Sequence, residues 1–124
     1  MTTLPIQTKI HDRKHFAELL QKNTGLIVIK FGADWCGPCR TIESLVQSYF
    51  DKCPPNVQCM IIDIDECFDV YAYLKSKKIV NGIPVILCYQ KGNVTYVPDD
   101  FVTGANPTEI AGFFERCAGM IANT

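Results

Sequence analysis

Two cysteines, Cys36 and Cys39, are separated by two residues in a motif that reads Trp35-Cys36-Gly37-Pro38-Cys39. A pair with this spacing can close a small disulfide ring or open to two thiols. At the start of a helix, unpaired backbone N–H groups and the positive end of the dipole favour a thiolate, the form that attacks disulfides. The motif therefore predicts thiol–disulfide exchange.

The two residues between the cysteines suit this chemistry. Pro38 fits a first helical turn because its missing N–H is not needed there. Gly37 allows another backbone to approach the first sulfur. Zinc sites and structural disulfides also use this spacing. The motif, however, follows an apolar strand and precedes an amphipathic helix, which is the setting of a redox motif.

Composition narrows the classes of protein to consider. The chain has 124 residues, 48% of them hydrophobic, which predicts one domain over residues 1–124, with residues 1–9 as an N-terminal extension. The net charge of −1 provides no basic surface for nucleic acid. No apolar run is long enough to cross a membrane and no signal peptide is visible, so we expect a soluble protein.

The remaining cysteines indicate the compartment. The total of seven is odd, and the five outside the motif, which have no repeated spacing, are Cys53, Cys59, Cys67, Cys88 and Cys117. A secreted disulfide scaffold would more often have an even count, and a zinc site would need a second close pair. We therefore expect incidental thiols, no bound metal, and a reducing compartment, most simply the cytoplasm.

Helical and strand patterns alternate along the chain, as in a layered α/β domain. Helices are predicted over residues 11–23 with Asp12 as the N-cap, from the cysteine motif onward, over 66–78, and from Pro107 after an Asn106 N-cap. Strands are predicted over 26–31 and 57–64, and a final hairpin joins 85–89 to 94–97. Phe68, Tyr71 and Leu74 are predicted core contacts of the third helix.

This order resembles the thioredoxin family. Besides residues 35–39, the matching segments are Asp63-Ile64-Asp65, Gly82-Ile83-Pro84 and Gly104-Ala105. The resemblance runs from about Ile10 to Ile121. It implies an α/β thioredoxin fold, with a central mixed β-sheet of four to five strands flanked by about four helices.

The resemblance also implies roles for particular residues. Cys36, the more exposed cysteine, would attack a substrate disulfide, and the more buried Cys39 would resolve the mixed disulfide. The Ile83–Pro84 bond would be cis. The residues implied to form the substrate-binding surface are Trp35, Ile83, Pro84, Gly104 and Ala105. A flavin- and NADPH-dependent thioredoxin reductase or a similar dithiol donor would supply electrons to a monomer that needs no cofactor of its own.

Lys30 departs from the family pattern. Thioredoxins usually carry a buried carboxylate at this position, paired with a lysine where this chain has Ile61. A protonated Lys30 near Cys39 would stabilise the reduced form and so raise the reduction potential. Burial would instead neutralise the lysine and make it a base for Cys39. Lys30 would otherwise pair with Asp63 or extend to solvent without a catalytic role.

A second departure is Ser44, which stands where the family has a helix-kinking proline and predicts a straighter helix after the motif. We expect a protein-disulfide reductase, since Gly37 and Pro38 between the cysteines favour reduction. Two alternatives stay open. An oxidant- or isomerase-leaning enzyme is favoured by Lys30, and a non-enzymatic binding module by the loss of the buried ion pair.

Overall fold

The buried run that begins at Leu26 forms the central strand of a four-stranded sheet. In the computed structural model, which describes residues 3–122, the strands lie in the order β2 (Val57–Asp63), β1 (Leu26–Gly32), β3 (Val85–Gln90) and β4 (Asp100–Thr103). β1 pairs with β2 in parallel and with β3 antiparallel, and β4 lies antiparallel to β3. The mixed sheet confirms the predicted fold class.

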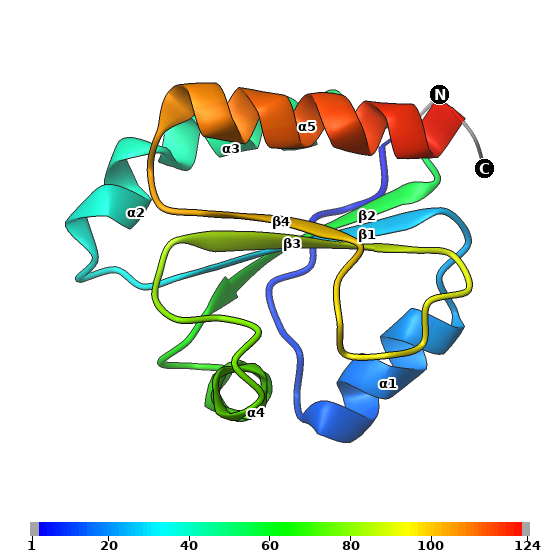
Figure 1. Cartoon of the computed structure of the whole chain (residues 1–124), viewed down its shortest axis with the longest axis horizontal. Helices are drawn as coiled ribbons and strands as arrows, with labels where there is room; N and C mark the ends of the chain where they lie inside the picture. Colours follow the sequence, from blue (N-terminus) through cyan, green and yellow to red (C-terminus); the bar gives the residue numbers. More distant parts are fainter. Residues whose placement is uncertain (1–2, 123–124) are drawn as a thin grey trace.

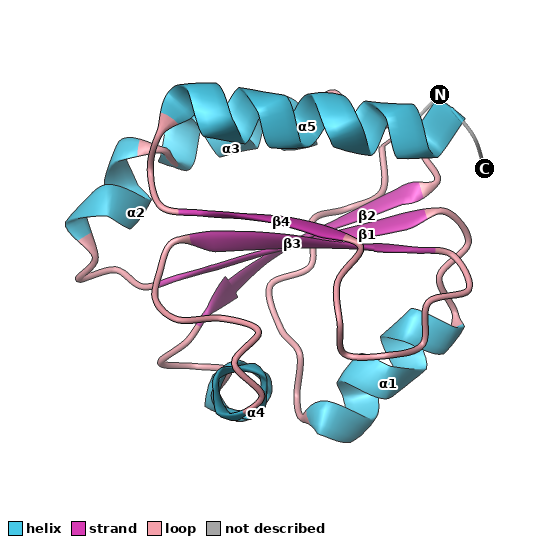
Figure 2. Ribbon diagram, in the orientation of Figure 1, coloured by secondary structure: helices cyan, strands magenta, loops and turns pink. Residues whose placement is uncertain are grey.

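Helices cover both faces of this sheet (Figure 1 and Figure 2). The elements in chain order are α1 (Arg13–Gln21), β1 (Leu26–Gly32), α2 (Gly37–Thr41), α3 (Glu43–Phe50), β2 (Val57–Asp63), α4 (Phe68–Ser76), β3 (Val85–Gln90), β4 (Asp100–Thr103) and α5 (Pro107–Ala122). α3 and α5 cover one face, and α1 and α4 cover the other. Among residues 3–122, no helix is both long enough and apolar enough to cross a membrane.

Side chains of β1 alternate between two hydrophobic cores, one on each face of the sheet. Ile27, Ile29 and Phe31 pack on the side of α1 and α4, whereas Leu26 and Val28 pack on the side of α3 and α5. Successive side chains of a strand point to opposite faces, so a strand buried on both faces must be apolar almost throughout. Lys30 is the exception in this strand.

Two predicted helix caps are confirmed. The Asp12 carboxylate accepts the His15 N–H at 2.8 Å and caps α1. The Asn106 side-chain oxygen accepts the N–H groups of Thr108 and Glu109 at 2.9 and 3.1 Å and caps α5. These contacts satisfy backbone donors that have no partner within the helix.

The predicted straight helix after the motif is wrong. The helix is interrupted at Ile42, which separates α2 from α3, although no proline stands at residue 44. The Thr41 hydroxyl donates to the Pro38 carbonyl at 2.8 Å. Such back-bonding by a threonine side chain competes with the helical ladder and bends helices.

The predicted hairpin strand over residues 94–97 is also wrong, because the strand that pairs with β3 is β4. Asn93 explains the difference. Its side chain accepts the Thr95 N–H at 3.0 Å and donates to the Val97 carbonyl at 2.9 Å. These local bonds hold the segment in turns, and they take the place of a strand ladder.

The third predicted helix begins later than expected. α4 starts at Phe68, whose side chain is 62% exposed and not a core contact as predicted. Tyr71 and Leu74 are buried as predicted, and Val70, one turn before Leu74, occupies the place expected for Phe68. The apolar stripe of the helix therefore starts two residues after the helix itself.

The segment predicted as an N-terminal extension lies along the sheet. Gln7 forms a parallel bridge with Met60, and its N–H donates to the Cys59 carbonyl at 3.1 Å. The Gln58 side chain also donates to the Pro5 carbonyl at 2.9 Å. The outer edge of β2 is therefore partly covered, which hinders pairing with another chain.

Candidate active site

The cysteine motif lies where β1 ends and α2 begins. Cys36 is the N-cap of α2, and its Sγ accepts the backbone N–H of Cys39 at 3.2 Å. A disulfide joins the two cysteines, whose Cα atoms are 5.3 Å apart. The N–H directed at the Cys36 sulfur would stabilise a thiolate there once the bond is reduced.

The predicted difference in exposure between the cysteines is wrong for this oxidised state. Cys36 and Cys39 are 5% and 4% exposed. Both cysteines are therefore buried in the disulfide-bonded state. Gly37 and Pro38 are exposed at the start of α2, so the helix start itself reaches the surface.

A second loop faces the motif. The Ile83–Pro84 peptide bond is cis, as the resemblance implied. The Ile83 carbonyl oxygen lies 3.9 Å from the Cys36 sulfur. The Gly104 N–H donates to the Pro84 carbonyl at 2.8 Å, and Gly104 has a φ of +93° that favours glycine. The Ile83–Pro84 loop therefore lies beside Cys36, and Gly104 is bonded to that loop.

The other predicted surface residues differ in their surroundings. Trp35 is 68% exposed, and its indole N–H donates to the Asp65 carboxylate at 2.8 Å. The Asp65 N–H in turn donates to the Asp63 carboxylate at 2.8 Å. Ala105 is half-buried and packs against the core beneath α5. Asp65 thus fixes the direction of the Trp35 ring, a role that the sequence did not suggest.

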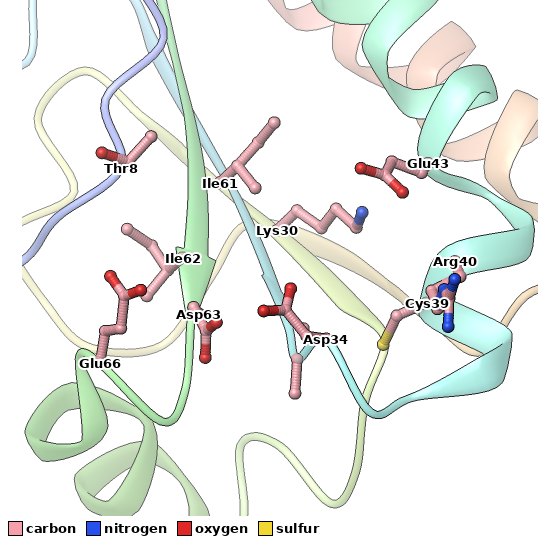
Figure 3. Close-up of a pocket in the computed structure, with 12 residues that line it drawn as sticks. Thr8, Lys30, Asp34, Cys39, Arg40, Glu43, Ile61, Ile62, Asp63 and Glu66 are labelled. Carbon is pink, nitrogen blue, oxygen red and sulfur yellow. The ribbon is translucent and has the colours of Figure 1, made fainter.

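A pocket of about 540 Å³ opens behind Cys39 (Figure 3). Lys30 lines it and is 6% exposed. A side chain at Gly32 would place its Cβ 3.3 Å from the Cys39 sulfur and 4.0 Å from Lys30 Cε. Gly32 therefore leaves open the space between the lysine stem and the sulfur.

Two of the alternatives for Lys30, pairing with Asp63 and extension to solvent, are not found, and the residue is buried. In Figure 3 the ammonium group points toward Glu43 on α3, and no ion pair within residues 3–122 joins it to Asp63. Burial lowers the pKa of Lys30, and the charge of Glu43 opposes this shift. Ile61 lies opposite Lys30 in the β1–β2 register, as the resemblance implied, so β2 supplies no charge there.

The comparison with known proteins covers most of the chain. A family model described as Thioredoxin matches residues 7–116. The chain belongs to the thioredoxin family. Thioredoxin from Mus musculus is 36% identical over 84 residues, which are 67% of this chain and 75% of that protein. Family membership and the Cys36–Cys39 bond identify a thiol–disulfide oxidoreductase.

Two other thioredoxins are less similar to this chain in sequence. Chloroplastic thioredoxin Y of Oryza sativa subsp. japonica is 27% identical over 90 residues, or 73% of this chain. That match covers 51% of the rice protein, so the chain spans about half the length of this relative. A thioredoxin structure from Malassezia sympodialis superposes with a TM-score of 0.70 at 22% identity, covering 95% of this chain and 97% of the other. This likeness shows the shared fold.

Two of the residues around the thioredoxin motif were not found from the sequence. Glu43 lies four positions after Cys39, a helical spacing that places both side chains on one face of the continuous helix that was predicted. Asp65 belongs to a segment that supported the resemblance, but its bond to Trp35 depends on how two loops meet. The spacing was thus a usable signal for Glu43, and the sequence held none for the Trp35–Asp65 contact.

Proposed function

We propose that this thioredoxin-family protein is a protein-disulfide reductase with Cys36 as the nucleophile and Cys39 as the resolving cysteine. The observation that carries the proposal is the environment of the Cys36 sulfur. It accepts the Cys39 N–H at 3.2 Å and lies 3.9 Å from the carbonyl oxygen of Ile83 in the facing loop. Cys39 lies on the side of the inner pocket.

The reaction balances as two exchanges. The Cys36 thiolate attacks one sulfur of a substrate disulfide, which forms a mixed disulfide and releases the other substrate sulfur as a thiolate. The Cys39 thiolate then attacks the Cys36 sulfur. This step closes the Cys36–Cys39 bond, releases the second substrate thiolate, and transfers two electrons to the substrate.

The substrate would bind as an extended segment across the second loop. Pro84 has no N–H and its carbonyl is already bonded to Gly104, which leaves the backbone of Ile83 as the group beside the sulfur. Trp35 would supply an exposed apolar contact, held in place by Asp65. Gly104 and Ala105 would form the far side of the surface. Main-chain pairing of this kind binds many sequences with modest selectivity.

Three residues would tune the redox pair. Pro38 and Gly37 start the helix that directs the Cys39 N–H at the Cys36 sulfur. Lys30 lies in the pocket behind Cys39, where its charge would favour the Cys39 thiolate. Because burial lowers the pKa of Lys30, its neutral form would also be accessible as an acceptor for the Cys39 proton.

The electron donor and the location are part of the proposal. A dithiol donor such as thioredoxin reductase would reduce the Cys36–Cys39 bond and complete electron transport to substrates. Five cysteines carry free thiols in the structure, Cys53, Cys59, Cys67, Cys88 and Cys117. Free thiols suit a reducing compartment, and we place the protein in the cytoplasm as a monomer.

The test is a Cys39→Ser substitution. Without the resolving sulfur, the mixed disulfide persists, so the variant should capture disulfide-containing proteins through Cys36 and release them on addition of dithiothreitol. Cys36→Ser should capture none, and both variants should lose reduction of a disulfide-linked protein such as insulin. Full insulin reduction by Cys36→Ser would contradict the proposal, as would capture of one protein by a variant that lacks both cysteines.

A further inference from the structure

A second pair of sulfurs lies on the face of the sheet covered by α3 and α5. Cys53 follows the end of α3, and Cys59 lies within β2. Their Sγ atoms are 3.5 Å apart, and the Cys59 thiol donates to the Cys53 sulfur. The Cys53 thiol in turn donates to the Tyr49 carbonyl at 3.5 Å. The contacts therefore form a directed chain from Cys59 through Cys53.

The surroundings permit these sulfurs to bond. A disulfide has an S–S distance of about 2.05 Å, so the sulfurs must approach by about 1.5 Å. Cys59 is held by the pairing of β2 with β1, where it lies opposite Val28. Cys53 lies beyond the last residue of α3 and before Pro54, so its side chain can turn toward Cys59 without breaking a helical or strand hydrogen bond.

The two cysteines differ in access and in acidity. Cys53 is half-buried and lines an apolar pocket of about 270 Å³, whereas Cys59 is 3% exposed. The hydrogen bond from Cys59 lowers the pKa of Cys53 and raises that of Cys59, while burial raises the pKa of both. Cys53 is therefore the sulfur that a small oxidant reaches first, and it is the better nucleophile.

The chain contains a natural comparison. Cys88 and Cys117 also influence each other, but they are 0% and 3% exposed, and the Cys88 thiol donates to the Met120 sulfur at 3.7 Å. Cys117 borders the same pocket as Cys53, and its pKa is raised by the bond to Cys88 and by burial. Of these two pairs, Cys53–Cys59 has the sulfur–sulfur hydrogen bond at 3.5 Å and the half-exposed member.

We propose that Cys53 and Cys59 form a second dithiol–disulfide couple, separate from Cys36 and Cys39, that small peroxides oxidise. Cys53 attacks a peroxide oxygen, becomes a sulfenic acid, and releases water when the peroxide is H₂O₂. The Cys59 sulfur then attacks the Cys53 sulfur and displaces a second water. Two thiols and one H₂O₂ give one disulfide and two waters. The chain would thereby carry a peroxide-responsive site in addition to the Cys36–Cys39 motif.

The experiment uses the full chain with Cys36→Ser and Cys39→Ser, so that its outcome does not depend on the proposed reductase activity. The reduced protein is treated with one equivalent of H₂O₂, alkylated, and digested without reductant. We expect the loss of two free thiols per chain and a bridged peptide that joins Cys53 to Cys59. Adding Cys88→Ala and Cys117→Ala as a matched control should leave the rate and the product unchanged.

The order of the steps is tested with dimedone, a reagent that labels sulfenic acids. Adding Cys59→Ser should stop the reaction at Cys53 and give a dimedone adduct there, while Cys53→Ser should give neither adduct nor bridge. The Cys36→Ser, Cys39→Ser protein, which retains Cys53 and Cys59, decides the proposal even if either further variant fails to fold. Free Cys53 and Cys59 after oxidation would overturn it. A bridge from Cys53 to Cys117, or from Cys88 to Cys117, in place of Cys53–Cys59 would do the same.

Discussion

The ammonium group of Lys30 faces the carboxylate of Glu43 at the pocket behind Cys39 (Figure 3). Lys30 belongs to β1 and Glu43 is the first residue of α3, so these two charges lie between the sheet and the interrupted helix. Gly32 leaves the space between this lysine and the Cys39 sulfur open. Lys30, Glu43 and Cys39 therefore line the same pocket.

Replacing Lys30 with aspartate should lower the reduction potential of the Cys36–Cys39 couple. A positive charge near Cys39 stabilises its thiolate and hence the reduced form, and a negative charge has the opposite effect. A tenfold change in the equilibrium constant of this two-electron couple is roughly 30 mV, and we expect a fall of that order. The measurement is equilibration in defined dithiol buffers. Lys75→Asp, an exposed site on α4, is the matched control and should leave the potential unchanged.

Replacing Lys30 with methionine should stabilise the fold near neutral pH. The pKa of Lys30 is lowered from 10.5 on folding, so the unfolded chain binds more protons and stability rises with pH between the folded-state pKa and 10.5. Removing a buried charge should therefore add about 1 kcal/mol to the free energy of unfolding at pH 7, and little above pH 10.5.

Urea unfolding of the wild type and Lys30→Met at the two pH values measures this effect. Lys75→Met removes an exposed lysine and should show no such pH-dependent gain. A Lys30→Met protein that is less stable than the wild type at pH 7 would mean that attraction to Glu43 outweighs the cost of burial.

Replacing Asp65 with alanine should weaken the use of protein substrates. The variant loses the acceptor of the Trp35 indole N–H, so the exposed ring samples other orientations. A hydrogen bond contributes about 1 kcal/mol, so we expect KM for a disulfide-linked protein to rise on the order of fivefold with little change in kcat. Asp65→Asn keeps a hydrogen-bond acceptor, so its KM should stay close to that of the wild type. Glu66→Gln is the control. An equal rise in KM for Asp65→Ala and Glu66→Gln would argue against a role of the indole hydrogen bond.

Replacing Asn106 with alanine should destabilise α5. The substitution leaves the Thr108 and Glu109 N–H groups without their side-chain acceptor. Loss of such a cap costs about 1 kcal/mol in the free energy of unfolding, and Asn106→Asp should recover most of it. Chemical denaturation checks both variants. Redox potential should not change in either, since the cap lies outside the cysteine pair.

Features with local causes were predictable from the sequence. The redox motif, the buried strand β1, and the caps at Asp12 and Asn106 depend on residues within one turn or one strand, and the structure confirms them. The thioredoxin fold and the cis bond before Pro84 followed from resemblance. The errors over residues 94–97 and at Phe68 arose where side-chain bonds or a late helix start altered a local pattern.

The sequence by itself determined the exchange chemistry and the order of helices and strands, because residue types and their spacing carry both. Only the tertiary structure decided which groups meet. In the folded chain Glu43 faces Lys30, Asp65 accepts a hydrogen bond from Trp35, and Cys59 lies beside Cys53. Such contacts depend on strand register and on where a helix is interrupted, and these arise from packing between distant segments that no local pattern records.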